Sequence, residues 1–207
     1  MTQAEHFFSI LYAGQTGVLE LRTFGPEKSD ASPEAAAQRK AANDARDFIP
    51  IVDGQLDHGR VNKYLAACEK ARLGAFFGVA LRSQASIKSK KGDAAHCQTL
   101  TALFVDADFK HLGEAETHRR ITAFPLTPSM VVRSGGGFHP YWMLSLPIQL
   151  QHEDGMATAK SYLKHLANSV AGIVDESVSE PVRVLRIPGS FNFKKVYPQP
   201  LPVTLIV

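Results

Sequence analysis

Residues 99–109 read TLTALFVDADF and predict a long, mostly apolar strand that ends in two carboxylates. Alternate residues of a strand project from the same face, so Asp106 and Asp108 are expected side by side at its end. Two like charges this close need a counter-charge, and a divalent cation such as Mg²⁺ or Mn²⁺, which prefers hard oxygen ligands, is the usual solution. The alternative is a strand that ends in solvent, where Asp-x-Asp occurs by accident.

The segments on either side of this stretch mix strands with helices. Upstream, the patterns predict a helix over residues 4–12, a strand over 17–24, a helix after Pro33, a helix from Asp57 and a buried strand over 74–82. Downstream, they predict a helix over 114–124, strands over 130–133 and 138–146, a long helix over 153–174 and a last strand over 203–207. In the strand 17–24, Leu19 and Leu21 should face the core and Arg22 the other side. This mixture predicts an α+β sheet protein with helices on one or both faces.

The composition is that of an ordinary folded domain. The 207 residues are 44% hydrophobic and 21% charged, which excludes disorder, collagen and coiled coil. The longest apolar run, residues 73–81, is too short to span a bilayer, and no targeting segment precedes it, so no membrane association is expected. Cys68 and Cys97 are too few for a disulfide framework or a four-cysteine zinc site and predict two reduced thiols, which fits the cytoplasm.

Cations gather in one short segment, although the net charge is only +3. Residues 82–91 contain Arg82, Lys88, Lys90 and Lys91 and no acid. Such a cluster is suited to an anionic partner, and we predict that these four side chains bind nucleic acid. A solvated basic loop between strands explains the charge equally well.

Three glycines separate two predicted strands at residues 133–139, RSGGGFH. Gly135, Gly136 and Gly137 allow backbone N–H groups to approach a ligand closely, as phosphate cradles require, and Ser134 and His139 bracket the turn with donors. The run matches neither the P-loop nor the dinucleotide fingerprint, because no helix follows it directly. The alternative is a flexible hairpin turn followed by a histidine that merely starts a strand.

A third cluster begins with Asp175 at the end of the long predicted helix and continues to a basic Pro-Gly turn. Arg183 and Arg186 would share a face if their segment makes a helical turn. Together with Lys194, these guanidinium groups are suited to triphosphate or nucleic-acid oxygens. In the alternative, Asp175 only ends a helix and the arginines are ordinary surface residues.

The order of these three motifs resembles the archaeo-eukaryotic primase superfamily, above all the primase-polymerase domains encoded by phages, plasmids and other mobile elements. The similarity extends from about Gly74 onward. It implies a single catalytic core in which an N-terminal α/β module, residues 1–95, packs on a module like an RNA-recognition motif, residues 96–207. The active site then lies in the cleft between the two modules.

The resemblance also implies residue roles. Asp106, Asp108 and Asp175 correspond to the metal-binding carboxylates, and His139 to the histidine that contacts the phosphates of the incoming nucleotide. Many relatives have a serine two residues before that histidine or a lysine in the turn, whereas this chain has Gly137 there. Phosphate contacts from the turn are then expected from backbone N–H groups and Ser134. The zinc module of some relatives has no cysteines to build it here.

The sequence therefore predicts a template-dependent nucleotidyltransferase, a DNA primase-polymerase that uses NTP or dNTP and two Mg²⁺ or Mn²⁺ ions and releases pyrophosphate. His139, Arg183, Arg186 and Lys194 would supply cations around the phosphates. Its expected partners are a single-stranded DNA template and a primer–template. We also expect the chain to be a fragment of a longer protein, with a helicase or accessory domain as a candidate for the region C-terminal to Val207. Two alternatives stay open, a metal-dependent phosphodiesterase or nuclease and a non-catalytic nucleic-acid-binding module.

Overall fold

The computed structural model describes residues 1–25, 32–171 and 180–206, so the predicted metal ligand Asp175 lies outside the described residues. In these ranges the chain forms a mixed α+β structure around one 11-stranded sheet, with a separate two-stranded sheet. The helices are α1 (Gln3–Leu11), α2 (Pro33–Asp44), α3 (His58–Lys70), α4 (Ala85–Ser89), α5 (Phe109–Leu112), α6 (Glu114–Ala123), α7 (Gly155–Ala171) and a 3-10 turn, η1 (Ala94–His96). The strands are β1 (Gly17–Thr23), β2 (Asp47–Val52), β3 (Gln55–Leu56), β4 (Ala75–Gly78), β5 (Leu81–Arg82), β6 (Cys97–Phe104), β7 (Ala107–Asp108), β8 (Met130–Arg133), β9 (Gly137–Gln149), β10 (Val184–Arg186), β11 (Phe191–Asn192), β12 (Leu201–Pro202) and β13 (Thr204–Ile206).

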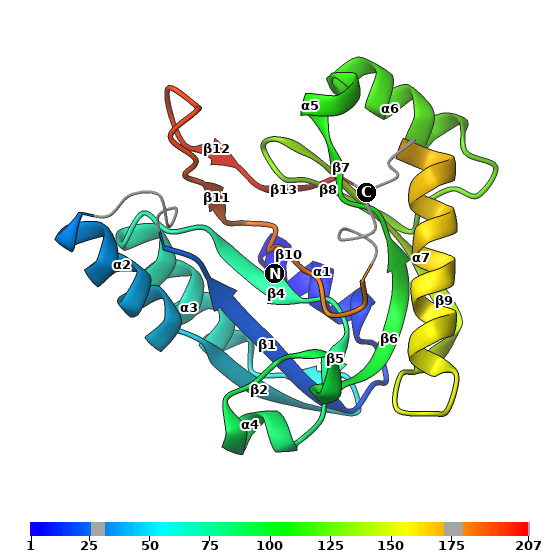
Figure 1. Ribbon diagram of the computed structural model, residues 1–207, viewed down its shortest axis with the longest axis horizontal. Coiled ribbons are helices and arrows are strands. Elements are labelled where there is room, and N and C mark those ends of the chain that lie inside the picture. The colour runs from blue at the N-terminus through cyan, green and yellow to red at the C-terminus, as the bar shows by residue number, and fades with distance from the viewer. Residues whose placement is uncertain (26–31, 172–179, 207) are drawn as a thin grey trace.

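The large sheet runs in the order β10-β4-β1-β5-β6-β9-β8-β13, and the strand pairs within the described ranges are antiparallel (Figure 1). β2 extends the sheet from β1, and β7 pairs with β9. The edge strand β10 comes from the end of the chain but pairs with β4 from its first half. This return brings the residues after 180 back against the N-terminal part of the sheet.

Alternation along β1 decides which face of the N-terminal sheet is buried. Leu19 and Leu21 are fully buried, as predicted, and α1 and α3 contribute Phe7, Phe8 and Val61 to the same core cluster. The rings of Phe7 and Phe8 lie edge-to-face with Phe77 of β4. The opposite face of β1 carries Glu20 and Arg22.

A smaller hydrophobic cluster supports the second half of the sheet. It is formed by Trp142 of β9, Ile121 of α6, and Leu166 and Val170 of α7. The predicted helix over residues 153–174 is α7, whose described part ends at Ala171. No helix in the described ranges is long and apolar enough to cross a membrane.

Three predicted elements differ from the structure. The strand expected over residues 99–109 ends at Phe104, and the chain then forms the separate strand β7, because Ala107 pairs with Phe138 of β9. The strand expected over 74–82 is divided into β4 and β5, which pair with different parts of the same edge of β1, β4 with Leu21–Thr23 and β5 with Val18. The segment 184–186 is a strand because it pairs with β4, so Arg186 does not lie on a helical turn.

Candidate active site

Asp106 lies at the centre of the candidate site, between β6 and β7. Its Oδ2 accepts a hydrogen bond from Arg183 Nη2 at 2.7 Å, and its Oδ1 lies 3.3 Å from His139 Nε2. Burial raises the pKa of Asp106, but the hydrogen bonds and charges of His139 and Arg183 outweigh it and hold the pKa well below the usual range. The carboxylate is therefore ionised at neutral pH, with only 22% of its side chain exposed.

His139 is positioned by the central strand β9, where it lies opposite Val132 of β8. The residue is almost completely buried. Its Nδ1 is also buried, without a hydrogen-bond partner among the described residues. A buried ring nitrogen with an unmet hydrogen bond is costly in a folded protein, and a bound ligand is one way to satisfy it.

Two arginines approach Asp106 from the other half of the sheet. Arg183 precedes β10, and its backbone carbonyl accepts a hydrogen bond from the Val79 N–H at 3.1 Å. Arg186, in β10, is 8% exposed and stacks on Phe76, with Cζ 4.5 Å from the ring centre. Burial lowers the pKa of Arg186 to about 10, although the negative charge of Asp106 acts in the opposite direction. Arg186 therefore keeps its positive charge at neutral pH.

The glycine turn has a packing reason for its composition. A Cβ atom on Gly137 would lie 2.5 Å from the carbonyl oxygen of Ala107, so the close approach of β7 requires glycine at this position. Ser134 Oγ donates to the carbonyl oxygen of Gly137 at 3.1 Å, and Asn192 Nδ2 donates to the carbonyl oxygen of Ser134. The Ser134 hydroxyl thus stabilises the turn itself, and a serine side chain in place of Gly137 would have no room there.

Asp108 has a different environment from Asp106, although the two were predicted side by side at one strand end. It caps α5, accepting from the Lys110 N–H at 3.0 Å, and its Oδ2 lies 3.5 Å from Lys110 Nζ. Over residues 1–25, 32–171 and 180–206, no three His, Cys, Asp or Glu side chains gather closely enough to hold a metal ion. Lys194, predicted to contact phosphates, is an exposed residue of the loop after β11.

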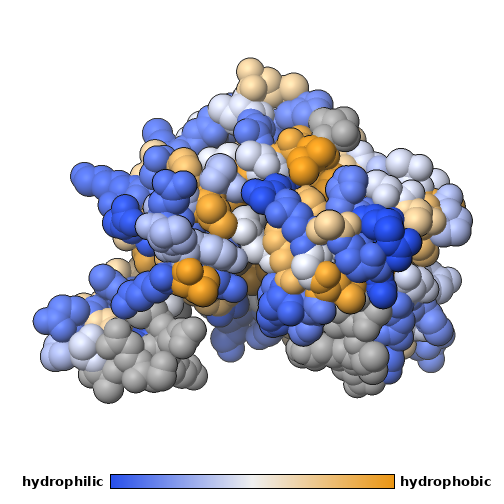
Figure 2. All heavy atoms as spheres, turned by 90° about the horizontal axis from the view of Figure 1, so that it is seen from above, coloured by the Kyte–Doolittle hydropathy of each residue, from blue (hydrophilic) through white to orange (hydrophobic). Residues whose placement is uncertain are grey.

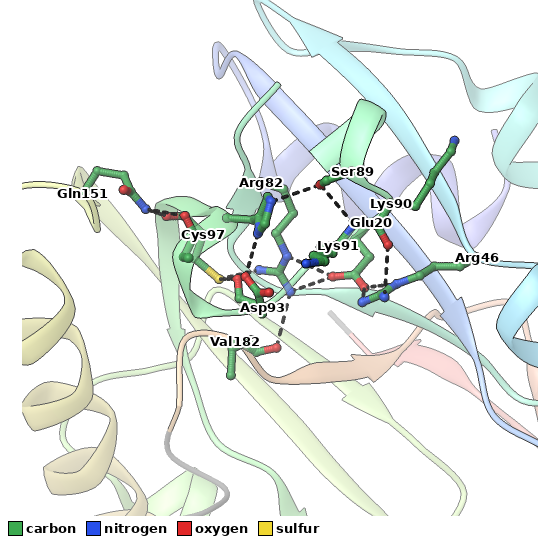
Figure 3. Close-up of polar contacts among 12 residues, drawn as sticks. Glu20, Arg46, Arg82, Ser89, Lys90, Lys91, Asp93, Cys97, Gln151 and Val182 are labelled. Carbon is green, nitrogen blue, oxygen red and sulfur yellow. Dashed lines mark hydrogen bonds and ion pairs between the residues drawn. The ribbon is translucent and has the colours of Figure 1, made fainter. Parts of the chain in front are cut away.

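The predicted nucleic-acid contact of Arg82 is wrong, because its side chain is fully buried. Its guanidinium pairs with the equally buried Glu20 at 2.9 Å and donates to the carbonyl oxygens of Ala80 and Val182 (Figure 3). Glu20 also accepts hydrogen bonds from Arg46. Arg82 therefore joins β1 and β5 to the segment that carries Arg183.

The other cations of that segment differ from Arg82. Lys88, Lys90 and Lys91 are exposed on and after α4, as a contact with nucleic acid requires. The loop that follows is held by His96, whose ring nitrogens hydrogen-bond Ser89 at 3.0 Å and Asp93 at 2.6 Å. Sequence reasoning missed this chain of contacts, as it missed Glu20 and Phe76. For Glu20 the local pattern gave no signal, because strand alternation places a residue between Leu19 and Leu21 on the face away from the core.

Comparison with known proteins shows which solved structures share this fold. No protein-family model and no curated protein matches the sequence. The structure is similar to the AEP domain of the primase-polymerase of cyanophage S-2L, with a TM-score of 0.59 and 16% identity; the match covers 99% of this chain and 88% of that chain. It is also similar to the primase RepB′, with a TM-score of 0.54 and 11% identity, covering 99% of this chain and 56% of that one. The chain has the fold of an archaeo-eukaryotic primase-type domain.

Proposed function

We propose that the chain is a nucleotidyltransferase, a DNA primase-polymerase that joins NTP or dNTP to a growing strand on a single-stranded template and releases pyrophosphate. The observation that carries this proposal is an ionised carboxylate, Asp106, among three groups that bind phosphate well: His139, Arg183 and Arg186. His139 Nδ1 and Arg183 Nε are buried without partners in the described ranges, so a phosphate group that reached them would satisfy both.

Asp106 and Asp108, with Asp175, are the residues we propose to hold Mg²⁺ or Mn²⁺. The donor set fits in its chemistry, because carboxylate oxygens are the ligands these ions prefer and Asp106 is held ionised. Such ions would lower the pKa of the attacking 3′-hydroxyl and neutralise charge on the triphosphate. The protein side chains His139, Arg183 and Arg186 would orient the phosphates, and the arginines would compensate the negative charge of the triphosphate.

The finer architecture belongs to the same proposal. Residues 1–95 would form the α/β module and residues 96–207 the module like an RNA-recognition motif, with the site between them. The pairing of β10 with β4 supports this, because it places Arg186 of the second part next to the first part, while Asp106 lies between β6 and β7 and His139 lies in β9. A helicase or accessory domain stays a candidate partner.

The test is a primer-extension assay. The chain is incubated with a single-stranded template, labelled nucleotides and Mn²⁺, with and without primer, and the products and pyrophosphate are measured. Template-dependent extension with stoichiometric pyrophosphate supports the proposal. Cleavage of the template without pyrophosphate would instead indicate a nuclease, and binding that is indifferent to a chelator, with neither reaction, a binding module.

Replacing His139 or Arg186 by alanine should chiefly impair nucleotide use. Each side chain is expected to contribute a charge-assisted hydrogen bond to the triphosphate, so kcat/KM for nucleotide should fall about ten- to a hundredfold. The exposed His152 and Arg119 supply matched alanine controls that should keep wild-type rates. If the His139 or Arg186 variant instead loses primer–template binding measured without nucleotide, these residues belong to the nucleic-acid groove.

Replacing Lys88, Lys90 and Lys91 together by glutamine should flatten the salt dependence of DNA binding. Each contact with a single strand contributes about 0.7 to the slope of log K against log salt, so the slope should decrease by roughly two. Lys63 and Lys70 of α3, both exposed, are the control pair and should leave the slope unchanged. An unchanged slope in the triple variant would remove these lysines from the DNA-binding surface.

A further inference from the structure

A row of two aromatic rings flanked by two arginines crosses the N-terminal sheet beside the candidate site. Arg186 of β10 and Arg22 of β1 both lie directly opposite Phe76 of β4, so the three side chains share one face of the sheet. This face is opposite the one covered by α1 and α3, because the neighbours of these residues, Leu21 and Phe77, are in the core.

Stacking contacts connect the row. Arg186 lies over the ring of Phe76 with its Cζ 4.5 Å from the ring centre, and the rings of Phe76 and Phe24 meet edge-to-face at 5.0 Å. Arg22 in turn lies over Phe24, with Cζ 4.8 Å from the centre of that ring. The row therefore runs Arg186, Phe76, Phe24, Arg22, and we refer to these four residues as the stacking row.

The two ends of the stacking row differ. Arg186 is almost buried, and the charge of Asp106 acts on it, so this end belongs to the candidate site. Near the other end, beside Arg22, Phe24 is 43% exposed. A Cβ atom on Gly74 would lie 2.6 Å from Arg186 Nη1, so the absence of a side chain there leaves room for the guanidinium.

The charge of the row is unbalanced. Within residues 1–25, 32–171 and 180–206, neither Arg22 nor Arg186 forms an ion pair with a carboxylate. Two cations and two rings without a paired acid form a surface suited to an anionic chain that carries flat rings. Seen from above, the surface of the molecule is mainly hydrophilic, with separate small hydrophobic patches (Figure 2).

We infer that the stacking row is the path of the single-stranded template away from the site, with bases stacked on Phe24 and Phe76 and backbone phosphates held by Arg22. This inference rests on the proposed function, since it takes a nucleic-acid strand as the occupant. Aromatic rings flanked by cations bind single strands in this way, because every base has a face that can stack on a ring and every phosphate linkage carries a negative charge.

The test compares two probes of equal charge, a labelled dT12 oligonucleotide and an abasic strand of the same length, by fluorescence anisotropy without nucleotide or metal. Wild type should bind dT12 more tightly than the abasic strand. Phe24→Leu should weaken dT12 binding about five- to a hundredfold and leave abasic binding nearly unchanged. Arg22→Gln should weaken both probes and reduce the salt slope by about 0.7.

Two further variants serve as controls for the loss of the Phe24 ring. Tyr162→Leu removes an exposed ring from α7 and should behave as wild type. Phe24→Trp keeps a ring in place if the leucine variant is unstable, and its emission should be quenched by dT12 but not by the abasic strand. Because Trp142 is buried, it contributes a nearly constant background.

The inference is overturned if Phe24→Leu binds dT12 as wild type does, or loses both probes equally. Either result combined with normal primer extension would leave the proposed function intact. The opposite outcome is also distinguishable. If the wild-type chain shows no primer extension but Phe24→Leu loses the preference for dT12, the stacking row is supported and the proposed nucleotidyltransferase activity is refuted.

Discussion

Replacing Arg82 by methionine should lower the free energy of unfolding by about 3–5 kcal/mol. The guanidinium is fully buried and bonds Glu20, Ala80 and Val182, and its loss leaves the Glu20 carboxylate buried with Arg46 as its remaining partner. Urea unfolding followed by circular dichroism measures the change. The control is Arg119→Met, which removes an exposed ion pair with Glu116 and should change the free energy by less than about 1 kcal/mol.

A double variant separates the charge from the packing. Because the cost of Arg82→Met comes chiefly from an under-compensated buried carboxylate, adding Glu20→Met should recover a substantial part of the lost stability. A double variant less stable than Arg82→Met alone would mean that the polar contacts of Glu20 with Arg46 matter more than its burial. A stable Arg82→Met single variant would contradict the ion-pair account altogether.

Asp106→Asn should reduce nucleotidyl transfer by at least about a hundredfold, the scale of losing one electrostatic contact to a transition state. Asparagine keeps the shape but removes the charge that pairs with Arg183 and His139. Primer extension under saturating Mn²⁺ measures the effect, and the exposed Asp154→Asn is the control. Extension at the wild-type rate in Asp106→Asn would remove this residue from the reaction.

The effect of Asp106→Asn on the free energy of unfolding should depend on pH. The pKa of Asp106 is lowered in the folded chain, so its ionised form stabilises the fold above the pKa of an unfolded aspartate, about 4, and this contribution is lost as the pH falls below that value. The difference in unfolding free energy between wild type and Asp106→Asn should therefore shrink between about pH 5 and pH 2. A constant difference would mean that the contacts with Arg183 and His139 do not hold Asp106 ionised.

The order of the motifs along the chain predicted which residues lie near one another, whereas the local reasoning did not. Asp106, His139, Arg183 and Arg186, assigned to one site by their order along the chain, do lie together. Strand periodicity, however, predicted two repelling carboxylates on one strand. The structure instead places His139 and Arg183 beside Asp106. These two residues come from β9 and from the segment before β10, and local periodicity carries no information on such long-range contacts.

Burial of charge was the least predictable property. Arg82 stands first in a run of exposed cations, and nothing in its own segment distinguishes it from Lys88. Its partner Glu20 lies 62 residues away, on a strand that β5 meets only through the pairing of Val18 with Arg82. Helix and strand identity came mostly from local pattern, whereas the divided strand 74–82 and the return of β10 depend on contacts between distant segments.

The return of β10 also determines the order in which the molecule can be completed during synthesis. β4 leaves the ribosome with one edge open, and the strand that closes this edge follows roughly a hundred residues later. Closing so long a loop is slow, and an open strand edge meanwhile is a hazard for aggregation. The event that closes the edge is also the event that delivers Arg186 to Asp106, so a nascent or truncated chain without residues 184–186 has neither a finished sheet nor the arginine side of its site.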